Sequence, residues 1–137
     1  MERKMADPAE QEVREVVDQM TEAMHAGDAA TLASLLSDRP GAVTIGTDPG
    51  EWWNKQQLLA SIKEAMSLDG SQIRAEHDEH HVHVAGDVAW TEGTGRFVSE
   101  KRGQRAMRMT GVFVREGGQW KVAQLHASIG VPNDEIF

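Results

Sequence analysis

The sequence predicts a single α+β domain in which three N-terminal helices pack on a strongly curved antiparallel sheet. Two observations predict it. Apolar residues recur at helical spacing through the first half, and from Ser71 onward the period changes to strand-like alternation between glycine turns. Helices followed by an antiparallel meander are typical of an α+β domain with its helices on one sheet face.

The first predicted helix has signals at both ends. Asp7 can cap it, Pro8 suits its first turn, and Gly27 can end it in the left-handed conformation. Its apolar residues form one stripe at helical spacing: Val13, Val16, Val17, Met20 and Met24. We therefore expect an amphipathic helix that faces the core.

Two more helices and a short strand complete the first half. Asp28 can cap a short helix, and a brief strand is expected over residues 42–47. Asn54, with Gln57 three residues on, starts a third helix that Asp69-Gly70 ends. The inward residues of the two helices are expected to be Leu32, Leu35, Leu36, Leu58, Leu59, Ile62, Ala65 and Met66.

The first strand of the meander changes phase along its length. Odd positions are apolar at Ile73 and Ala75, whereas even positions are apolar at Val82 and Val84. A period-two pattern changes phase only where a residue is inserted, so we predict a β-bulge between about His77 and His81. A bulge there would bend the sheet strongly.

Composition limits the classes of partner. The 137 residues suit one domain, 1–137, with residues 1–7 and 132–137 as loose termini. The net charge of −8 argues against nucleic acid or an anionic membrane as main partner, and the lack of cysteine excludes disulfides and thiolate chemistry. Neither a signal peptide nor a membrane-spanning apolar run is visible, so we expect a cytoplasmic protein.

Three segments are similar to those of a known family. Residues 45–53 (Ile-Gly-Thr-Asp-Pro-Gly-Glu-Trp-Trp) resemble its segment leading into the third helix, and residues 86–90 resemble its strand-opening turn. Residues 118–128, which contain a Trp and a His-x-Ser, resemble its closing strand. With the order of elements, these segments make residues 8–131 resemble the NTF2-like superfamily, and more narrowly its SnoaL-like and DUF4440-type branch.

The resemblance implies a cone with a pocket between the concave sheet and the helices, and a homodimer formed through the outer face of the sheet. Members include steroid isomerases, polyketide cyclases, dehydratases and non-catalytic binding or assembly domains. Steroid isomerases of this fold use a tyrosine in the oxyanion site, and this chain has no tyrosine. The cyclases are usually assigned an aspartate in the late strands, and residues 104–130 contain none.

His126 is the leading candidate for a catalytic base. Its position on the last strand is in phase with Trp120, Gln124 and Ser128, a row expected to line one sheet face. Histidine can act as a general base near neutral pH. The alternative is a histidine hydrogen-bonded within a half-buried sheet, where it shapes the pocket or the interface.

Acidic and aromatic residues supply the other candidates. Asp48 or Glu92 could be a proton-transfer partner, since an apolar pocket raises a carboxyl pKa, although Asp48 also fits a turn. Arg108 could pair with these acids or with an anionic ligand. Flat walls for a planar or cyclic ligand could come from Trp52, Trp53 and Trp90, which could equally pack in the core.

Four histidines, His77, His80, His81 and His83, invite a metal-site interpretation. Strand geometry disfavours it, because only His81 and His83 point the same way and no third ligand is visible. We expect a solvated or dimer-face cluster, with neither metal nor cofactor.

The sequence thus predicts a homodimeric pocket protein that binds a small, largely apolar organic molecule. Any chemistry would be cofactor-free proton transfer, such as isomerisation, cyclisation or dehydration, with His126 as base and Asp48 or Glu92 as its partner. The alternative is a non-catalytic binding or dimeric assembly module. The sequence does not decide whether the protein is an enzyme.

Overall fold

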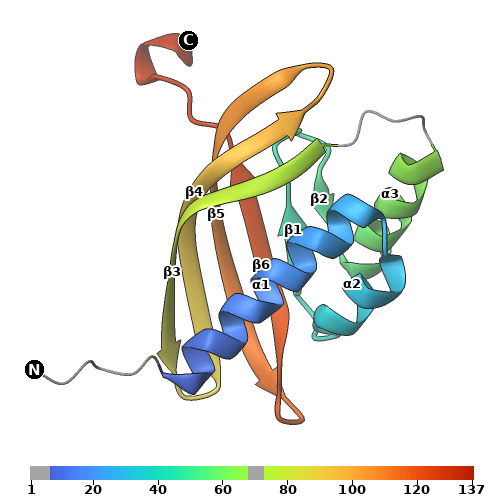
Figure 1. Ribbon diagram of the computed structural model, residues 1–137, viewed down its shortest axis with the longest axis vertical. Coiled ribbons are helices and arrows are strands. Elements are labelled where there is room, and N and C mark those ends of the chain that lie inside the picture. Colours follow the sequence, from blue (N-terminus) through green and yellow to red (C-terminus); the bar gives the residue numbers. More distant parts are fainter. Residues whose placement is uncertain (1–6, 68–72) are drawn as a thin grey trace, which may run out of the picture.

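The computed structural model describes residues 7–67 and 73–137, and in them three helices pack on one face of a six-stranded sheet (Figure 1). The helices are α1 (Pro8–Ala26), α2 (Ala29–Leu35) and α3 (Lys55–Ser67). The strands are β1 (Val43–Ile45), β2 (Trp52–Trp53), β3 (Ile73–Ala85), β4 (Val88–Ser99), β5 (Gly103–Glu116) and β6 (Gln119–Ser128). This is the predicted α+β architecture.

The sheet has the strand order β2-β1-β6-β5-β4-β3. All neighbours are antiparallel except β1 and β6, which run parallel. The strand predicted over residues 42–47 is present as the shorter β1. The strand β2 was not predicted, because two tryptophans after a Pro-Gly turn are too few to show an alternation of apolar and polar residues. Both termini were predicted to be loose. In the C-terminal tail, after β6, a short 3-10 helix forms, η1 (Asn133–Glu135). At the N-terminus, residues 1–6 lie outside the described residues.

The three helices begin where the capping signals predict. The Asp7 carboxylate accepts the Ala9 N–H at 2.9 Å, and Gly27 ends α1 with φ of 69°. At α3, the side chains of Asn54 and Gln57 each accept the other's backbone N–H at 2.9 Å, which is a capping box. Of the predicted inward residues of α3, Ala65 is exposed instead, and the Met66 side chain and Asp69-Gly70 lie outside the described residues.

Two irregularities bend the sheet. The register of β3 on β4 shifts between His77 and Glu79, which confirms the predicted bulge. A second shift, not predicted, occurs where β5 passes from Val112 to Phe113 and leaves Ala123 of β6 without a partner. Each extra residue increases twist and bends its strand, so the four long strands curve around α1 (Figure 1).

The core lies between α1 and the concave face of the sheet. Phe113 on β5 has no exposed surface, and the indole N–H of Trp120 on β6 donates to Glu12 of α1 at 3.1 Å. The predicted stripe of α1 is confirmed, because Val13, Val17 and Met20 are buried. Within the described residues, no helix is long and apolar enough to cross a membrane.

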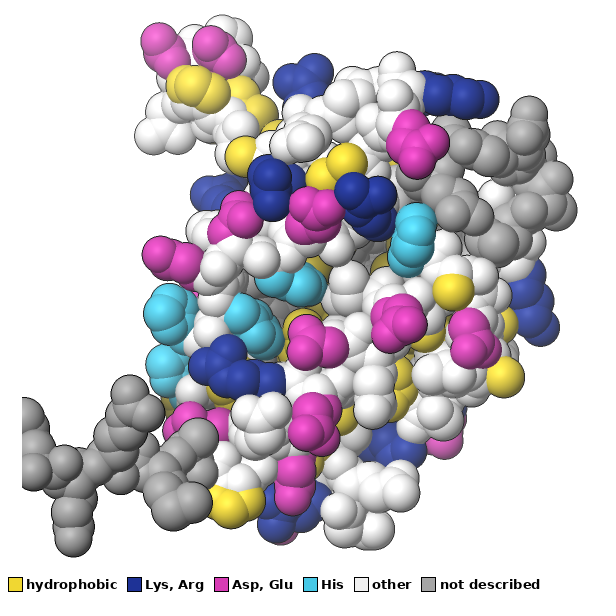
Figure 2. All heavy atoms as spheres, viewed as in Figure 1, with side chains coloured by type: hydrophobic (Ala, Val, Ile, Leu, Met, Phe, Trp, Pro, Cys, Tyr) yellow, Lys and Arg dark blue, Asp and Glu magenta, His cyan; other side chains and the backbone are white. Residues whose placement is uncertain are grey.

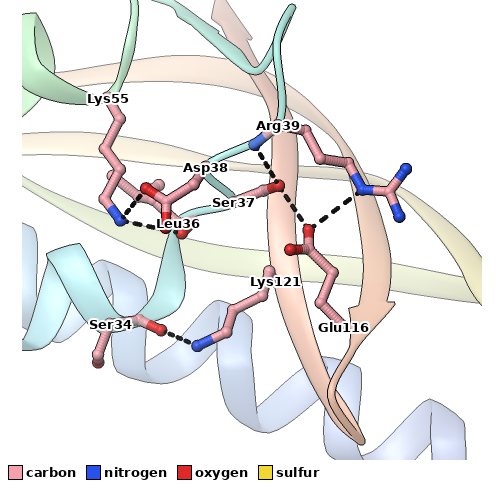
Figure 3. A network of polar contacts seen from close by, with 8 residues as sticks. All are labelled: Ser34, Leu36, Ser37, Asp38, Arg39, Lys55, Glu116 and Lys121. Atoms are coloured by element: carbon pink, nitrogen blue, oxygen red, sulfur yellow. Dashed lines mark hydrogen bonds and ion pairs between the residues drawn. The ribbon is translucent and has the colours of Figure 1, made fainter.

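A polar network closes the end of the molecule where the β5–β6 turn lies (Figure 3). Ser37, which is 1% exposed, donates to Glu116 Oε1 at 2.5 Å, and Arg39 Nε lies 3.4 Å from the same oxygen. Nearby, Lys121 Nζ donates to the Ser34 carbonyl. The loop between α2 and β1 is therefore tied to the end of the β5–β6 hairpin.

Candidate functional site

A cavity of about 490 Å³ lies at the opposite end of the concave face from this network. It is bounded by the C-terminal turns of α1, the β1–β2 segment and the ends of the long strands near the β4–β5 turn. A volume of this size lies within the range of small-molecule sites in proteins. The curvature of the sheet and the oblique path of α1 therefore leave space at this end that side chains do not fill.

The walls of the cavity are mainly apolar. Met20 and Met24 line it from α1, and Phe97 and Met109 line it from β4 and β5. Trp53 adds an aromatic side chain from β2. Methionine adapts its shape to irregular surfaces, and aromatic rings offer rigid flat contacts, so this lining suits an apolar molecule.

Small residues contribute to the space in the cavity. Ala75 on β3 and Ala127 on β6 line it, and their strand partners are Phe97 and Met109 respectively. Gly46 lines it beside β1. Since neighbouring strands are fixed about 4.8 Å apart, small side chains at these positions leave a void rather than a contraction of the sheet.

Among the residues that the structure describes, two ionisable groups other than arginine line the cavity, His25 and Glu51. Glu51 Oε1 accepts the Asp48 N–H at 2.8 Å, and the Glu51 carbonyl accepts the Gly46 N–H at 2.8 Å. A Cβ at Gly46 would lie 2.8 Å from Glu51 Oε1, so the glycine allows the carboxylate to sit there. Among the described residues, no group hydrogen-bonds the buried Nδ1 of His25.

Thr21 connects the cavity to two half-buried histidines. Its hydroxyl donates to the Val17 carbonyl at 2.9 Å and lies 3.0 Å from His77 Nε2. Because that hydroxyl has only one proton, His77 is the donor and carries its proton on Nε2. The His80 ring centroid is 5.7 Å from that of His77. Burial lowers the pKa of both histidines, and the neighbouring His77 lowers that of His80 further.

Comparison with protein families decides the relationship. Residues 13–132 match the family model described as SnoaL-like domain. The chain belongs to the SnoaL-like domain family. The architecture and the solved structures place it in the NTF2-like superfamily, which confirms the resemblance, whereas the DUF4440 subtype stays a prediction.

Three solved structures illustrate how widely this fold is used. An NTF2-like protein of unknown function from Pseudomonas putida KT2440 is 23% identical with a TM-score of 0.80, and the match covers 96% of this chain and 93% of that one. A "putative dehydratase" from the NTF2-like family of Streptomyces avermitilis is 26% identical with a TM-score of 0.74, and the match covers 93% of this chain and 100% of that one. A "putative calcium/calmodulin dependent protein kinase II association domain" from Xanthomonas campestris is 22% identical with a TM-score of 0.71, covering 96% of each. Comparison with curated proteins finds no match.

Most of the predicted site residues of this SnoaL-like domain lie on the outer face of its sheet. The pairing register aligns Trp90 with Val112 and Gln124, and the next outward row aligns Glu92 with Thr110 and His126. Arg108 lies in the following row and donates to Ser128 Oγ at 3.3 Å. None of these candidates lines the cavity. The catalytic roles predicted for His126 and Glu92 stay predictions that require a ligand on the outer face.

The expectation that Trp120 shares a row with Gln124 and His126 is wrong. The extra residue Ala123 changes the phase of β6, so Trp120 points to α1 and is buried whereas Gln124 and His126 are exposed on the other side. Alternation alone could not reveal this bulge, because apolar Val122, Ala123 and Leu125 are compatible with either face.

The three candidate site residues in the segment before α3 have different surroundings. Trp53 lines the cavity, as the pocket prediction expects, whereas Trp52 is 67% exposed. Asp48 is exposed, and its carboxylate accepts the Gly50 N–H at 2.8 Å, which is the turn-forming role considered as its alternative. Among the described residues, the neighbouring Glu51, not Asp48, brings a carboxylate of this segment to the cavity.

The histidine cluster gathers over β3 (Figure 2) but is divided between two faces. His77 and His80 lie on the side of α1, whereas His83 stacks on Trp90 of the outer face and pairs with Glu92 at 2.7 Å. The bulge between His77 and Glu79 causes this division. In the described part of the chain, no three His, Cys, Asp or Glu side chains are grouped to hold a metal ion.

Sequence reasoning missed His25, Arg102 and Arg105 as cavity residues. His25 comes directly after Met24, the last residue of the apolar stripe of α1, and only a wider stripe would have included it. Arg105, Met107 and Met109 are two residues apart on β5 and therefore share one face of that strand. Once the two methionines are recognised as the inward residues, the sequence places Arg105 on the same face.

Proposed function

We propose that this SnoaL-like domain binds a small, largely apolar organic molecule in the cavity between α1 and the sheet. The observation that carries the proposal is the cavity of about 490 Å³ with apolar walls from α1, β2, β4 and β5. When an open cavity holds no ligand, its apolar walls face water. A ligand that covers these walls removes apolar surface from water, which is favourable.

Proton transfer without a cofactor is the reaction class we propose for this cavity. His25 and Glu51 are an imidazole and a carboxylate that face the same space, and together they could exchange a proton with a ligand. The Streptomyces avermitilis protein is described as a putative dehydratase, and dehydration is one of the reactions that such proton transfer could drive. His25 would take the role of base that the sequence assigned to His126, because His126 lies on the other face.

Filling the cavity tests the binding proposal. N-Phenyl-1-naphthylamine is a neutral aromatic probe that becomes fluorescent in apolar surroundings, and we expect it to bind the native protein with a saturable signal. Ala127→Phe places a ring in the cavity and should weaken binding at least about tenfold, or 1.4 kcal/mol. The matched control Ala106→Phe adds the same ring on the exposed outer side of β5 and should leave binding unchanged.

Equal binding by the native protein and Ala127→Phe would overturn the proposal. The thermal unfolding midpoint of each variant must be measured beside the titration, because a misfolded variant would also lose the signal. Loss of the probe from Ala127→Phe with an unchanged far-UV circular dichroism spectrum is the result that supports the cavity as the binding site.

We also propose a homodimer formed through the outer face of the sheet. Two apolar side chains of β4 are exposed there, Val88 at 43% and Trp90 at 44%, and the resemblance to NTF2-like proteins implies this mode of association. Sedimentation velocity should find a dimer, and Trp90→Glu should shift it to monomer by placing two charges against each other. A native monomer, or a dimer unchanged in Trp90→Glu, would contradict this interface.

A further inference from the structure

We infer that the ligand is an amphipathic anion, whose apolar body fills the cavity and whose oxyanion group is held at the rim by Arg102 and Arg105. The inference rests on the proposed function and adds the chemical class of the ligand. Both arginines line the cavity, and both are exposed at its edge.

One hairpin carries both guanidinium groups. Arg105 is on β5 directly opposite Phe97 of β4, and both residues line the cavity. The Arg102 N–H donates to the buried Ser99 Oγ at 3.1 Å, and Gly103 adopts a φ of 87°, so the backbone of the turn is defined. The two arginines therefore stand on a fixed support three residues apart, beside the aromatic wall.

The charge of the rim is opposite to that of the whole protein. The chain has a net charge of −8, yet the described lining contains two arginines against one acid, Glu51. Glu51 Oε1 already accepts the Asp48 N–H. The local excess of positive charge in an acidic protein would concentrate anions at this opening and repel cations.

Arg102 and Arg105 differ in their partners from Arg96 of the same hairpin. Arg96, on the outer side of the same hairpin, lies 3.1 Å from Glu76 and 3.3 Å from Asp78. Among the described residues, no carboxylate forms an ion pair with Arg102 or Arg105. A guanidinium group offers several N–H donors in a planar fork that fits carboxylate, phosphate or sulfonate oxygens. No other described residue accepts from these guanidinium donors in a hydrogen bond or an ion pair, so they match an oxyanion next to an apolar body.

Two fluorescent probes that share one aromatic body separate the anionic group from the apolar part. 1-Anilinonaphthalene-8-sulfonate carries a sulfonate, and N-phenyl-1-naphthylamine is the same molecule without it. In Arg102→Ala/Arg105→Ala we expect the affinity for the sulfonate probe to fall about tenfold and the affinity for the neutral probe to change less than twofold. Lys101→Ala removes a positive charge from the same turn, outside the cavity lining, and should leave both affinities within twofold of native.

The outcomes distinguish the two proposals. If the neutral probe binds the cavity but the arginine substitutions leave the sulfonate probe unaffected, the inference is wrong and the proposed function stands. If neither probe binds the native protein, the proposed function fails and the inference fails with it. Displacement of the sulfonate probe by decanoate or decyl phosphate at clearly lower concentrations than by decanol supports the inference, and the stronger of the two anionic competitors identifies the preferred oxyanion. Equal potency of decanol and the two anions would contradict it.

Discussion

The two ends of the concave face have the same framework and opposite interiors. At one end, Phe113 and Val13 have no exposed surface, and the loop network around Ser37 closes the structure (Figure 3). At the other end, the same helix and the same long strands enclose about 490 Å³ of space. The same arrangement of α1 and the long strands thus allows a packed core at one end and a cavity at the other, depending on the side chains at each end.

The difference arises mainly on the sheet. The stripe of α1 is apolar along its whole length, from Val13 to Met24. The facing sheet residues include the buried aromatic side chains of Phe113 and Trp120 at the closed end, whereas at the other end Ala75 and Ala127 stand beside the larger Phe97 and Met109. An end packed with large residues provides stability, and an end with small residues provides space for a ligand. Substitutions of the same kind at the two ends should therefore have different effects.

The largest expected difference is between two phenylalanines. Phe113→Ala at the closed end should lower the free energy of unfolding by about 3 to 5 kcal/mol, because it opens a cavity in a fully packed region. Phe97→Ala should cost clearly less, since that half-buried ring already borders open space. Urea denaturation of both variants measures the difference. Equal losses would show that the two ends are packed alike.

Added volume should show the converse difference. A Cβ at Gly111 would lie 3.0 Å from both Phe113 and Thr91, so Gly111→Ala should destabilise the protein by about 1 to 3 kcal/mol. Ala127→Phe adds a whole ring at the cavity and should cost less than the single methyl group. Thermal unfolding of the two variants provides the comparison. A larger loss for Ala127→Phe would contradict an open cavity.

The network at the closed end should contribute a moderate amount. Ser37→Ala removes the donor to Glu116 and the acceptor of the Arg39 N–H, so it should cost about 1 kcal/mol or somewhat more. Asp38→Ala breaks the exposed pair with Lys55 at 2.8 Å and should have a smaller effect, because water screens that pair. Chemical denaturation that ranks Asp38→Ala above Ser37→Ala would refute the importance of the buried serine.

The smallest effect concerns pH. Burial lowers the pKa of His77 and His80 below the usual 6.5, so protons bind the unfolded chain more readily than the folded one. Their contribution to stability is fully present above pH 6.5 and is lost as the pH falls from 6.5 through the lowered values. Urea midpoints measured from pH 7.5 to 5 should fall less steeply in His77→Gln/His80→Gln. Parallel curves for variant and native protein would disprove this.

Local signals made most of the fold predictable. The caps at Asp7 and Asn54, the stop at Gly27 and the phase change around His77 each depend on a few neighbouring residues, and the structure has all of them. The strand β2 was missed because Trp52 and Trp53 are held only by pairing with β1, a tertiary contact without a local pattern. The unexpected bulge at Ala123 was hidden for a different reason, since Val122, Ala123 and Leu125 are apolar and compatible with either face of the sheet.

The candidate site was less predictable, because it depends on which face each side chain takes. Because of one extra residue in β6, Ala123, the side chains of Gln124 and His126 point to the opposite face from Trp120. His126, predicted to be the base in the pocket, therefore lies on the outer face of the sheet. Residues that do line the cavity, such as His25 and Arg105, come from elements far apart in sequence. The spacing of residues in the sequence does not show which residues of distant elements line the same cavity.

Three of the four tryptophans provide the most direct test of the central claim that the end with the cavity is a binding site. Their indole N–H signals in a nitrogen-15 correlation spectrum report on different places: Trp53 on the cavity, Trp120 on the closed end, and Trp90 on the outer face. Titration with N-phenyl-1-naphthylamine should shift the Trp53 signal and leave those of Trp120 and Trp90 in place. A shift of Trp90 without one of Trp53 would place the binding surface on the outer face and contradict the account.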